Sequence, residues 1–138
     1  MDFKNATIAI ATEDGISVSS HFGRAPFYEV LSLSDGKVVK RERREKAGHQ
    51  SFGHTESEQG YHQGEAADQQ HQSMVSPITD CMVLIVRGMG QGAVEHVRRA
   101  HIQPVLTSLH TIDEVLNAIS SDTLESDPRR IHQHHGQH

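Results

Sequence analysis

The sequence has no tryptophan, only one cysteine (Cys81), and few aromatic residues of any kind. A single cysteine cannot form a disulfide within the chain, which fits a reducing compartment. No apolar run approaches the roughly 20 residues of a membrane-spanning helix, and no signal peptide precedes the first strand-like stretch. We therefore expect a cytoplasmic protein with no membrane partner.

An excess of positive charge is also absent. The 138 residues include 13 basic and 18 acidic side chains, which gives a formal net charge of −5. The one basic run, residues 40–46, alternates in sign and is typical of a solvated strand end rather than of a phosphate-binding stripe. We expect no nucleic-acid partner, and the length fits a single domain.

Histidine, in contrast, is abundant, with twelve residues. Several of them fall in residues 47–66, a stretch dominated by glycine, serine, glutamine and histidine, and others end the chain. Such composition favours mobile segments over packed ones. We predict one cofactor-binding domain over residues 1–132, with a histidine-rich loop at 47–66 and a flexible histidine-rich tail at 133–138.

The loop histidines are candidate metal ligands because neutral imidazole binds zinc, copper, nickel and iron. The candidates are His49, His54 and His62. Their spacing matches no closed zinc site, so a polar loop with adventitious metal affinity is an equal alternative.

Hydrophobic patterning predicts an α/β fold. Strands are expected at residues 6–11, 27–33, 38–43, 82–86 and 104–107. Helices are expected at residues 67–79, from about residue 93 to 99, and at 111–119. An antiparallel front end joined to βαβ units predicts a mixed sheet of about five strands flanked by helices.

Two local signals support this layout. Asp35-Gly36 supplies the positive φ angles of a tight hairpin turn. Thr111 and Glu114 have the spacing of a capping box at the start of the last helix. From Ser120 on, the sequence turns polar, and it ends in residues 131–138, which are expected to form a frayed tail.

The buried strand at 82–86 leads into a glycine-rich turn, Arg87-Gly88-Met89-Gly90-Gln91-Gly92, and then into a helix. Glycines let the backbone turn sharply, and a helix N-terminus directs free N–H groups toward an anion. A tight strand-to-helix turn with no ligand is an equal alternative. Residues 88, 90 and 93 also match a dinucleotide fingerprint, but no acidic residue ends the following strand.

Three segments resemble one known family in their order and spacing. They are Ser20-His21-Phe22-Gly23-Arg24-Ala25, Arg87-Gly88-Met89-Gly90-Gln91-Gly92-Ala93 and Thr111-Ile112-Asp113-Glu114. Together they resemble the dinitrogenase iron–molybdenum cofactor biosynthesis family, whose members include NifX, NafY and the C-terminal domain of NifB. The resemblance covers residues 5–46 and 67–132. It implies a ribonuclease-H-like fold and a non-enzymatic role in binding or carrying an iron–sulfur or iron–molybdenum cluster.

The resemblance also implies where the cofactor would bind. The residues are His21, Phe22, Gly23 and Arg24 of the first motif and Arg87, Gly88, Met89, Gly90 and Gly92 of the second. His21 would be a metal ligand, and Arg24 would balance the charge of an anionic cluster. Cys81 is a further candidate ligand, although one thiolate cannot hold a cluster within one chain and a small buried side chain is the alternative.

We therefore expect a non-catalytic binding or carrier protein for a metal cofactor, acting with a cofactor-assembly protein as a monomer or weak homodimer. A histidine-rich divalent metal-ion buffer or sensor is one alternative. An anion- or nucleotide-binding regulatory module that uses the glycine turn is another. No motif pairs a nucleophile with a base, and no convincing set of carboxylates points to nuclease chemistry.

Overall fold

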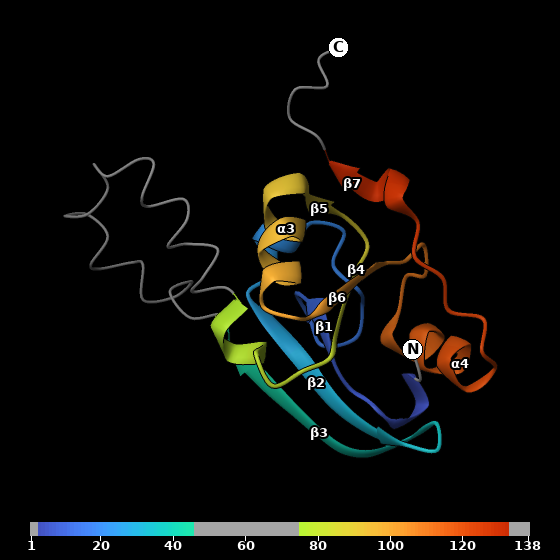
Figure 1. Ribbon diagram of the computed structural model, residues 1–138. Coiled ribbons are helices and arrows are strands. Elements are labelled where there is room, and N and C mark those ends of the chain that lie inside the picture. The colour runs from blue at the N-terminus through green and yellow to red at the C-terminus, as the bar shows by residue number, and fades with distance from the viewer. Residues whose placement is uncertain (1–2, 46–74, 133–138) are drawn as a thin grey trace.

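The computed structural model describes residues 3–45 and 75–132, and a mixed five-stranded sheet forms its centre (Figure 1). The strands are β1 (Thr7–Thr12), β2 (Phe27–Ser34), β3 (Lys37–Glu45), β4 (Val83–Val86) and β6 (Gln103–Leu106). They lie in the order β3-β2-β1-β4-β6. β2 is antiparallel to both of its neighbours, whereas β4 is parallel to β1 and β6. The predicted α/β fold with a mixed sheet is confirmed.

Two helices, α3 (Gln91–Arg99) and α4 (Ile112–Ser120), cover opposite faces of the sheet. The core beneath α3 combines its Ala93, Val94 and Val97 with Leu84 and Val86 of β4. The core beneath α4 combines Ile112, Val115 and Ile119 of the helix with Val83 and Ile85 of β4. Alternate side chains of β4 thus enter two different cores, which explains why this strand has no polar alternation.

The local signals at the turn and at the helix start form as predicted. Asp35 and Gly36 have φ angles of 53° and 80° at the β2–β3 turn. The Thr111 hydroxyl accepts a hydrogen bond from the Glu114 amide at 3.1 Å, and the Glu114 carboxylate accepts one from the Thr111 amide at 3.1 Å. α4 therefore begins with the predicted capping box.

The glycine-rich turn and the C-terminal segment differ from the predictions. Met89–Gly90 form a short strand, β5, which pairs in parallel with β7 (Ile131–His132), and α3 begins at Gln91 rather than near residue 93. The frayed tail predicted at residues 131–138 was wrong for residues 131 and 132, which form β7 directly after a 3-10 helix, η4 (Pro128–Arg130). The physical reason is burial: Ile131 packs against the same core that holds Met89.

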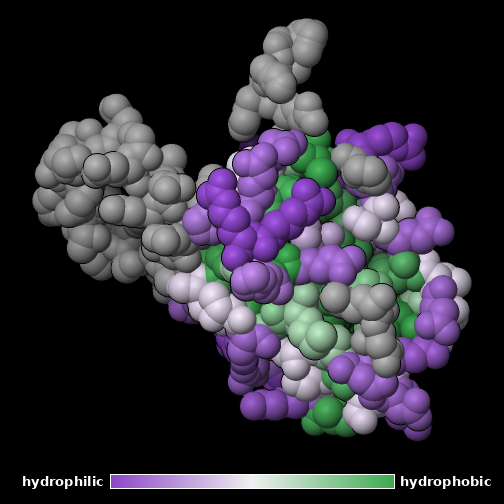
Figure 2. Space-filling model, in the orientation of Figure 1, coloured by the Kyte–Doolittle hydropathy of each residue, from purple (hydrophilic) through white to green (hydrophobic). Residues whose placement is uncertain are grey.

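Other predictions fall partly or wholly outside the described residues. Of the helix expected at 67–79, the structure describes only the last part, which contains a 3-10 helix, η3 (Ser76–Ile78). The loop at 47–66 and the tail at 133–138 lie outside the described residues. Within the described part of the chain, no helix is long and apolar enough to cross a membrane. Figure 2 shows hydrophilic side chains over much of the face that carries α3, with small apolar areas between them.

Candidate functional site

The two sequence motifs lie side by side at one edge of the sheet. β1 and β4 are adjacent and parallel, so the segments that follow them meet at their carboxyl ends. The amide of Phe22 donates to the carbonyl of Gly88 at 3.0 Å, and the amide of Arg87 donates to the carbonyl of Ser19 at 2.8 Å. The His21 loop and the segment at residues 87–90 are therefore held next to each other by backbone hydrogen bonds.

His21 is exposed at this edge of the sheet, and its backbone is held by a buried neighbour. The residue precedes a 3-10 helix, η2 (Phe22–Arg24). Its amide donates to the Ser19 hydroxyl at 3.2 Å, and that hydroxyl lies 3.0 Å from the His21 carbonyl oxygen. Because Ser19 is only 4% exposed, the loop is anchored to the protein interior while His21 faces the surface.

The next three residues of the first motif differ in burial: one is buried in the core and two are exposed. Phe22 is buried, and its ring centroid lies 6.3 Å from that of Tyr28 in the core beneath α3. Gly23 and Arg24 are exposed. A Cβ atom at Gly23 would meet no atom within 4 Å, so this glycine leaves open space next to His21.

Two glycines of the second motif, Gly90 and Gly92, add no bulk at the start of α3, whereas Gly88 is buried. Gly88, Gly90 and Gly92 all have negative or extended φ values rather than the left-handed conformation that favours glycine. A Cβ atom at Gly90 would meet nothing within 4 Å. Gly90 is the residue before α3 and provides no side-chain cap, and Gly92 is exposed in the first turn. The N-terminus of α3 therefore has no side-chain cap, and the positions of Gly90 and Gly92 carry no side-chain bulk.

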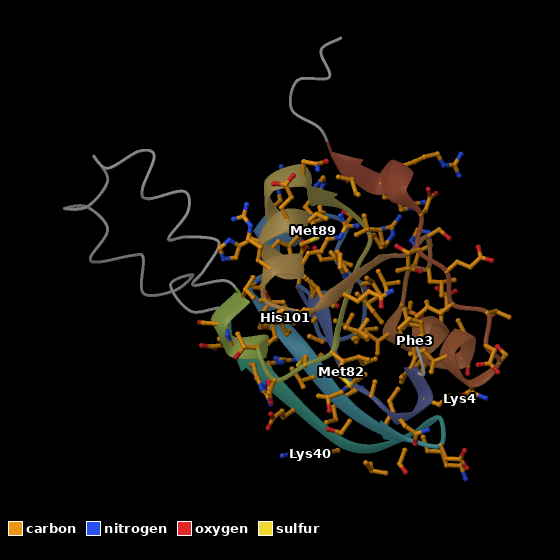
Figure 3. The ribbon with its side chains drawn as sticks, viewed as in Figure 1. Phe3, Lys4, Lys40, Met82, Met89 and His101 are labelled. Carbon is orange, nitrogen blue, oxygen red and sulfur yellow. The ribbon has the colours of Figure 1, made fainter. Side chains whose placement is uncertain are left out.

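Met89 and Arg87 have different surroundings. Met89 is 1% exposed and belongs to the core beside α3 (Figure 3), so its thioether packs against apolar side chains rather than facing a ligand. Arg87 is half-buried at the end of β4. Its Nε atom is buried and has no hydrogen-bond partner among the described residues.

A family model described as dinitrogenase iron-molybdenum cofactor matches residues 4–122. The chain belongs to this family. No curated protein is a significant match to the sequence. The matched region contains both motifs and ends before η4 and β7.

Solved structures similar to this family member share its fold. The PH0822 protein is 22% identical, with a TM-score of 0.59, over 88% of this chain and 94% of that one. The apo form of the orange protein from Desulfovibrio gigas is 18% identical, with a TM-score of 0.59, over 88% and 92%. A protein from Methanocaldococcus jannaschii is 10% identical, with a TM-score of 0.62, over 89% and 95%.

Cys81 of this family member lies away from the two motifs. It precedes β4, whereas Arg87 follows that strand, and six extended residues span about 20 Å. Cys81 is 4% exposed, and burial, together with the negative charge of Asp80, raises the pKa of its thiol to about 12. A neutral buried thiol is a poor metal ligand, and the structure does not bring Cys81 and His21 together.

Metal ligands are sparse in the described part of this family member. Residues 3–45 and 75–132 contain no group of three or more histidine, cysteine or acidic side chains that could hold a metal ion. His49, His54 and His62 lie outside the described residues. At this end of the sheet the described residues thus offer one exposed imidazole, that of His21, and two arginines, Arg24 and Arg87. This set suits a group that brings most of its own ligands and carries negative charge.

Sequence reasoning missed one residue at this end of the sheet. Arg130 is half-buried, directly precedes β7, and has a buried Nε atom with no hydrogen-bond partner in the described part of the chain. The sequence held no signal for it, because a two-residue strand has no periodicity.

Proposed function

We propose that this chain is a non-catalytic carrier for a metal cofactor of the iron–sulfur or iron–molybdenum type, acting in metallocofactor assembly. The observation that supports this most directly is the hydrogen bond from the Phe22 amide to the Gly88 carbonyl, which holds the two family motifs side by side. Family membership supplies the class of cargo.

In this proposal each part of the candidate site has a separate role. The imidazole of His21 is the ligand from the protein to a metal of the cargo. Arg24 and Arg87 balance the negative charge of the cluster, and the N-terminus of α3, which has no side-chain cap, adds further positive potential. A single protein ligand holds the cargo less firmly than a closed site of four, which suits transfer to a client.

A carrier role requires no acid–base pair and no covalent intermediate. The exposed position of His21 and the absence of bulk at Gly23 leave room for a second protein to approach the cargo. We propose a cofactor-assembly protein as that partner and a cytoplasmic location for the exchange.

The twelve histidines favour a second candidate function, a divalent metal-ion buffer or sensor that uses residues 47–66 and the tail. Stoichiometry separates it from the carrier. A carrier binds one coloured, air-sensitive cluster, whereas a buffer binds several interchangeable divalent ions.

The decisive experiment is an anaerobic titration with iron and sulfide, and separately with nickel or zinc, followed by absorption spectroscopy and metal analysis. His21→Ala is compared with His110→Ala, a matched control because His110 is also exposed beyond the parallel strands but lies outside both motifs. A third variant replaces His49, His54 and His62 with glutamine.

The carrier proposal predicts a saturable iron–sulfur chromophore that is lost in His21→Ala and retained in the other two variants. If wild-type protein forms no chromophore but binds several divalent ions, and only the triple variant loses them, the carrier proposal is wrong and the buffer is supported.

A further inference from the structure

The C-terminal segment lies across the carboxyl end of the sheet. The amide of Leu106, at the end of β6, donates to the Ser126 hydroxyl at 3.0 Å, and the amide of Asp127 donates to the Leu106 carbonyl at 2.8 Å. Ile131 then pairs with Met89 in the β5–β7 ladder. Figure 1 shows this path from α4 to β7 beside β5.

This path brings Arg130 to the same end of the sheet as Arg87. Arg87 follows Val86, and Val86 pairs with Leu106 of β6. Leu106 in turn forms hydrogen bonds with both Ser126 and Asp127. Met89 pairs with Ile131 in the β5–β7 ladder. Arg87 lies two residues before Met89, and Arg130 lies one residue before Ile131. Paired strands lie about 4.8 Å apart, so the two arginines emerge from neighbouring backbone segments.

Both side chains have an unsatisfied buried donor. The Nε atoms of Arg87 and Arg130 are buried and have no hydrogen-bond partner among the described residues. No other buried side-chain nitrogen or oxygen atom of those residues lacks a partner. A buried donor without an acceptor is costly, and native proteins rarely leave one. The nearest acidic residue along the segment, Asp127, accepts hydrogen bonds from Arg129 at 3.0 and 3.1 Å, and its charge also acts on Arg130.

We infer that Arg87 and Arg130 form a binding site for an anion with several acceptor atoms. A guanidinium presents a planar fork of donors, including Nε, that matches such an anion better than a single acceptor. Arg130 lies beyond residues 4–122, so this half of the site is an addition to the region that matches the family. The inference deepens the proposed function and rests on it for the physiological anion, which is either the cluster itself or a small free oxyanion.

The first test uses inorganic phosphate as the probe and the full-length protein labelled with ¹⁵N-arginine. The Nε–H resonances of Arg87 and Arg130 should shift along one saturable curve, while that of exposed Arg98 stays in place. Arg87→Gln and Arg130→Gln should each weaken phosphate binding about tenfold. Arg129→Gln is the matched control, because it removes the same charge from the adjacent position, and it should change affinity by no more than about twofold.

Equal weakening in Arg129→Gln and Arg130→Gln would indicate general charge attraction and overturn the inference. Unshifted Nε resonances at saturating phosphate would overturn it too. Thermal melting of each variant identifies a folding failure. If Arg87→Gln does not fold, the phosphate affinity of Arg130→Gln alone tests the inference. Arg130 lies outside the central sheet, so we expect this variant to fold.

The iron–sulfide titration on the same variants separates the two sources of the anion. If Arg130→Gln also weakens cluster retention and phosphate competes with the cluster, the cluster is the ligand of the arginine pair. If cluster retention is unaffected while phosphate binding is weakened, the site stands with a small oxyanion as its ligand. If wild type forms no cluster but binds phosphate through both arginines, the carrier proposal fails and the anion site stands.

Discussion

At the scale of single residues, the described part of the protein contains two kinds of buried polar group: those with hydrogen-bond partners and those without. Glu29 of β2 is buried and accepts hydrogen bonds from Arg41 and Arg43 of β3, each at 2.9 Å. Arg43 also lies 4.0 Å from the centroid of the Phe27 ring. The mixed-charge run is therefore partly structural over residues 40–45, whereas the Nε atoms of Arg87 and Arg130 have no hydrogen-bond partner within residues 3–45 and 75–132.

A prediction at this scale concerns the thiol of Cys81. Because burial raises its pKa to about 12, the thiol should react slowly with an alkylating reagent at pH 8 in the native protein and rapidly in urea. The neutral thiol is favoured by folding, so its contribution to stability is full below the unfolded pKa of about 8.5 and is lost as the pH rises toward 12. Mass spectrometry of the labelled protein measures both rates.

Cys81→Ala provides the functional half of this prediction. It should leave formation of the iron–sulfur chromophore unchanged, because Cys81 lies at the opposite end of β4 from His21. Rapid labelling of the native thiol, or loss of the chromophore in Cys81→Ala, would contradict the assignment of this cysteine to the core.

At the scale of secondary-structure elements, the N-terminal ends of α4 and α3 differ in how they are capped. α4 begins with a complete capping box, whereas the N-cap of α3 is Gly90, which provides no side-chain cap. The cap of α4 also ties the loop after β6 to the loop after β1, since Ser17 forms a bridge with Thr111. One helix start is thus closed by the protein's own side chains, and the other remains open beside the candidate site.

Thr111→Ala should lower the free energy of unfolding by about 1 kcal/mol, because the Glu114 amide loses its acceptor. Thr111→Ser keeps the hydroxyl and should retain most of the stability. Urea denaturation measures both. Equal losses in the two variants would show that the methyl group, and not the hydrogen bond, is responsible.

The same capping box has a pH dependence. Hydrogen bonds from the amides of His110 and Thr111 lower the pKa of Glu114. Its contribution to stability is therefore present above the unfolded pKa of about 4.3 and is lost as the pH falls through the folded value. Glu114→Gln should weaken the fall in stability over that acidic range.

At the scale of the whole molecule, the candidate site is assembled from separate parts of the chain. The segments after β1, β4 and β6 and the C-terminal segment all meet at the carboxyl end of the three parallel strands. The two helices cover the faces of the sheet, and the segment that ends in β7 lies at this end (Figure 1). This location agrees with the general placement of ligands in α/β sheets.

The charge of the whole molecule should reverse in mildly acidic solution. Protonation of twelve histidines adds more positive charge than the net charge of −5 can balance. Electrophoretic mobility should change sign between pH 7 and about pH 5.5, because the sequence pI is about 6.1. Replacing His49, His54 and His62 with glutamine should move the crossing to lower pH, and a mobility that stays negative at pH 5.5 would contradict the prediction.

The sequence by itself determined those features that depend on neighbouring residues. Branched apolar runs specified β1 and β4, Asp35-Gly36 specified the hairpin turn, and Thr111 with Glu114 specified the start of α4. These signals act within a few residues, where steric limits and local hydrogen bonds decide the conformation. The order of the motifs also indicated a surface that combines His21 with the glycine-rich segment.

Only the tertiary structure decided what those elements bring together. The pairing of Met89 with Ile131 joins segments about 40 residues apart through two-residue strands, which are too short to leave a periodic pattern. Burial against a shared core stabilises that pairing and thereby places Arg130 beside the end of β4. The same long-range packing keeps Cys81 at the opposite end of the strand, because the direction of a strand, and not the residue type, sets which side chains meet at a site.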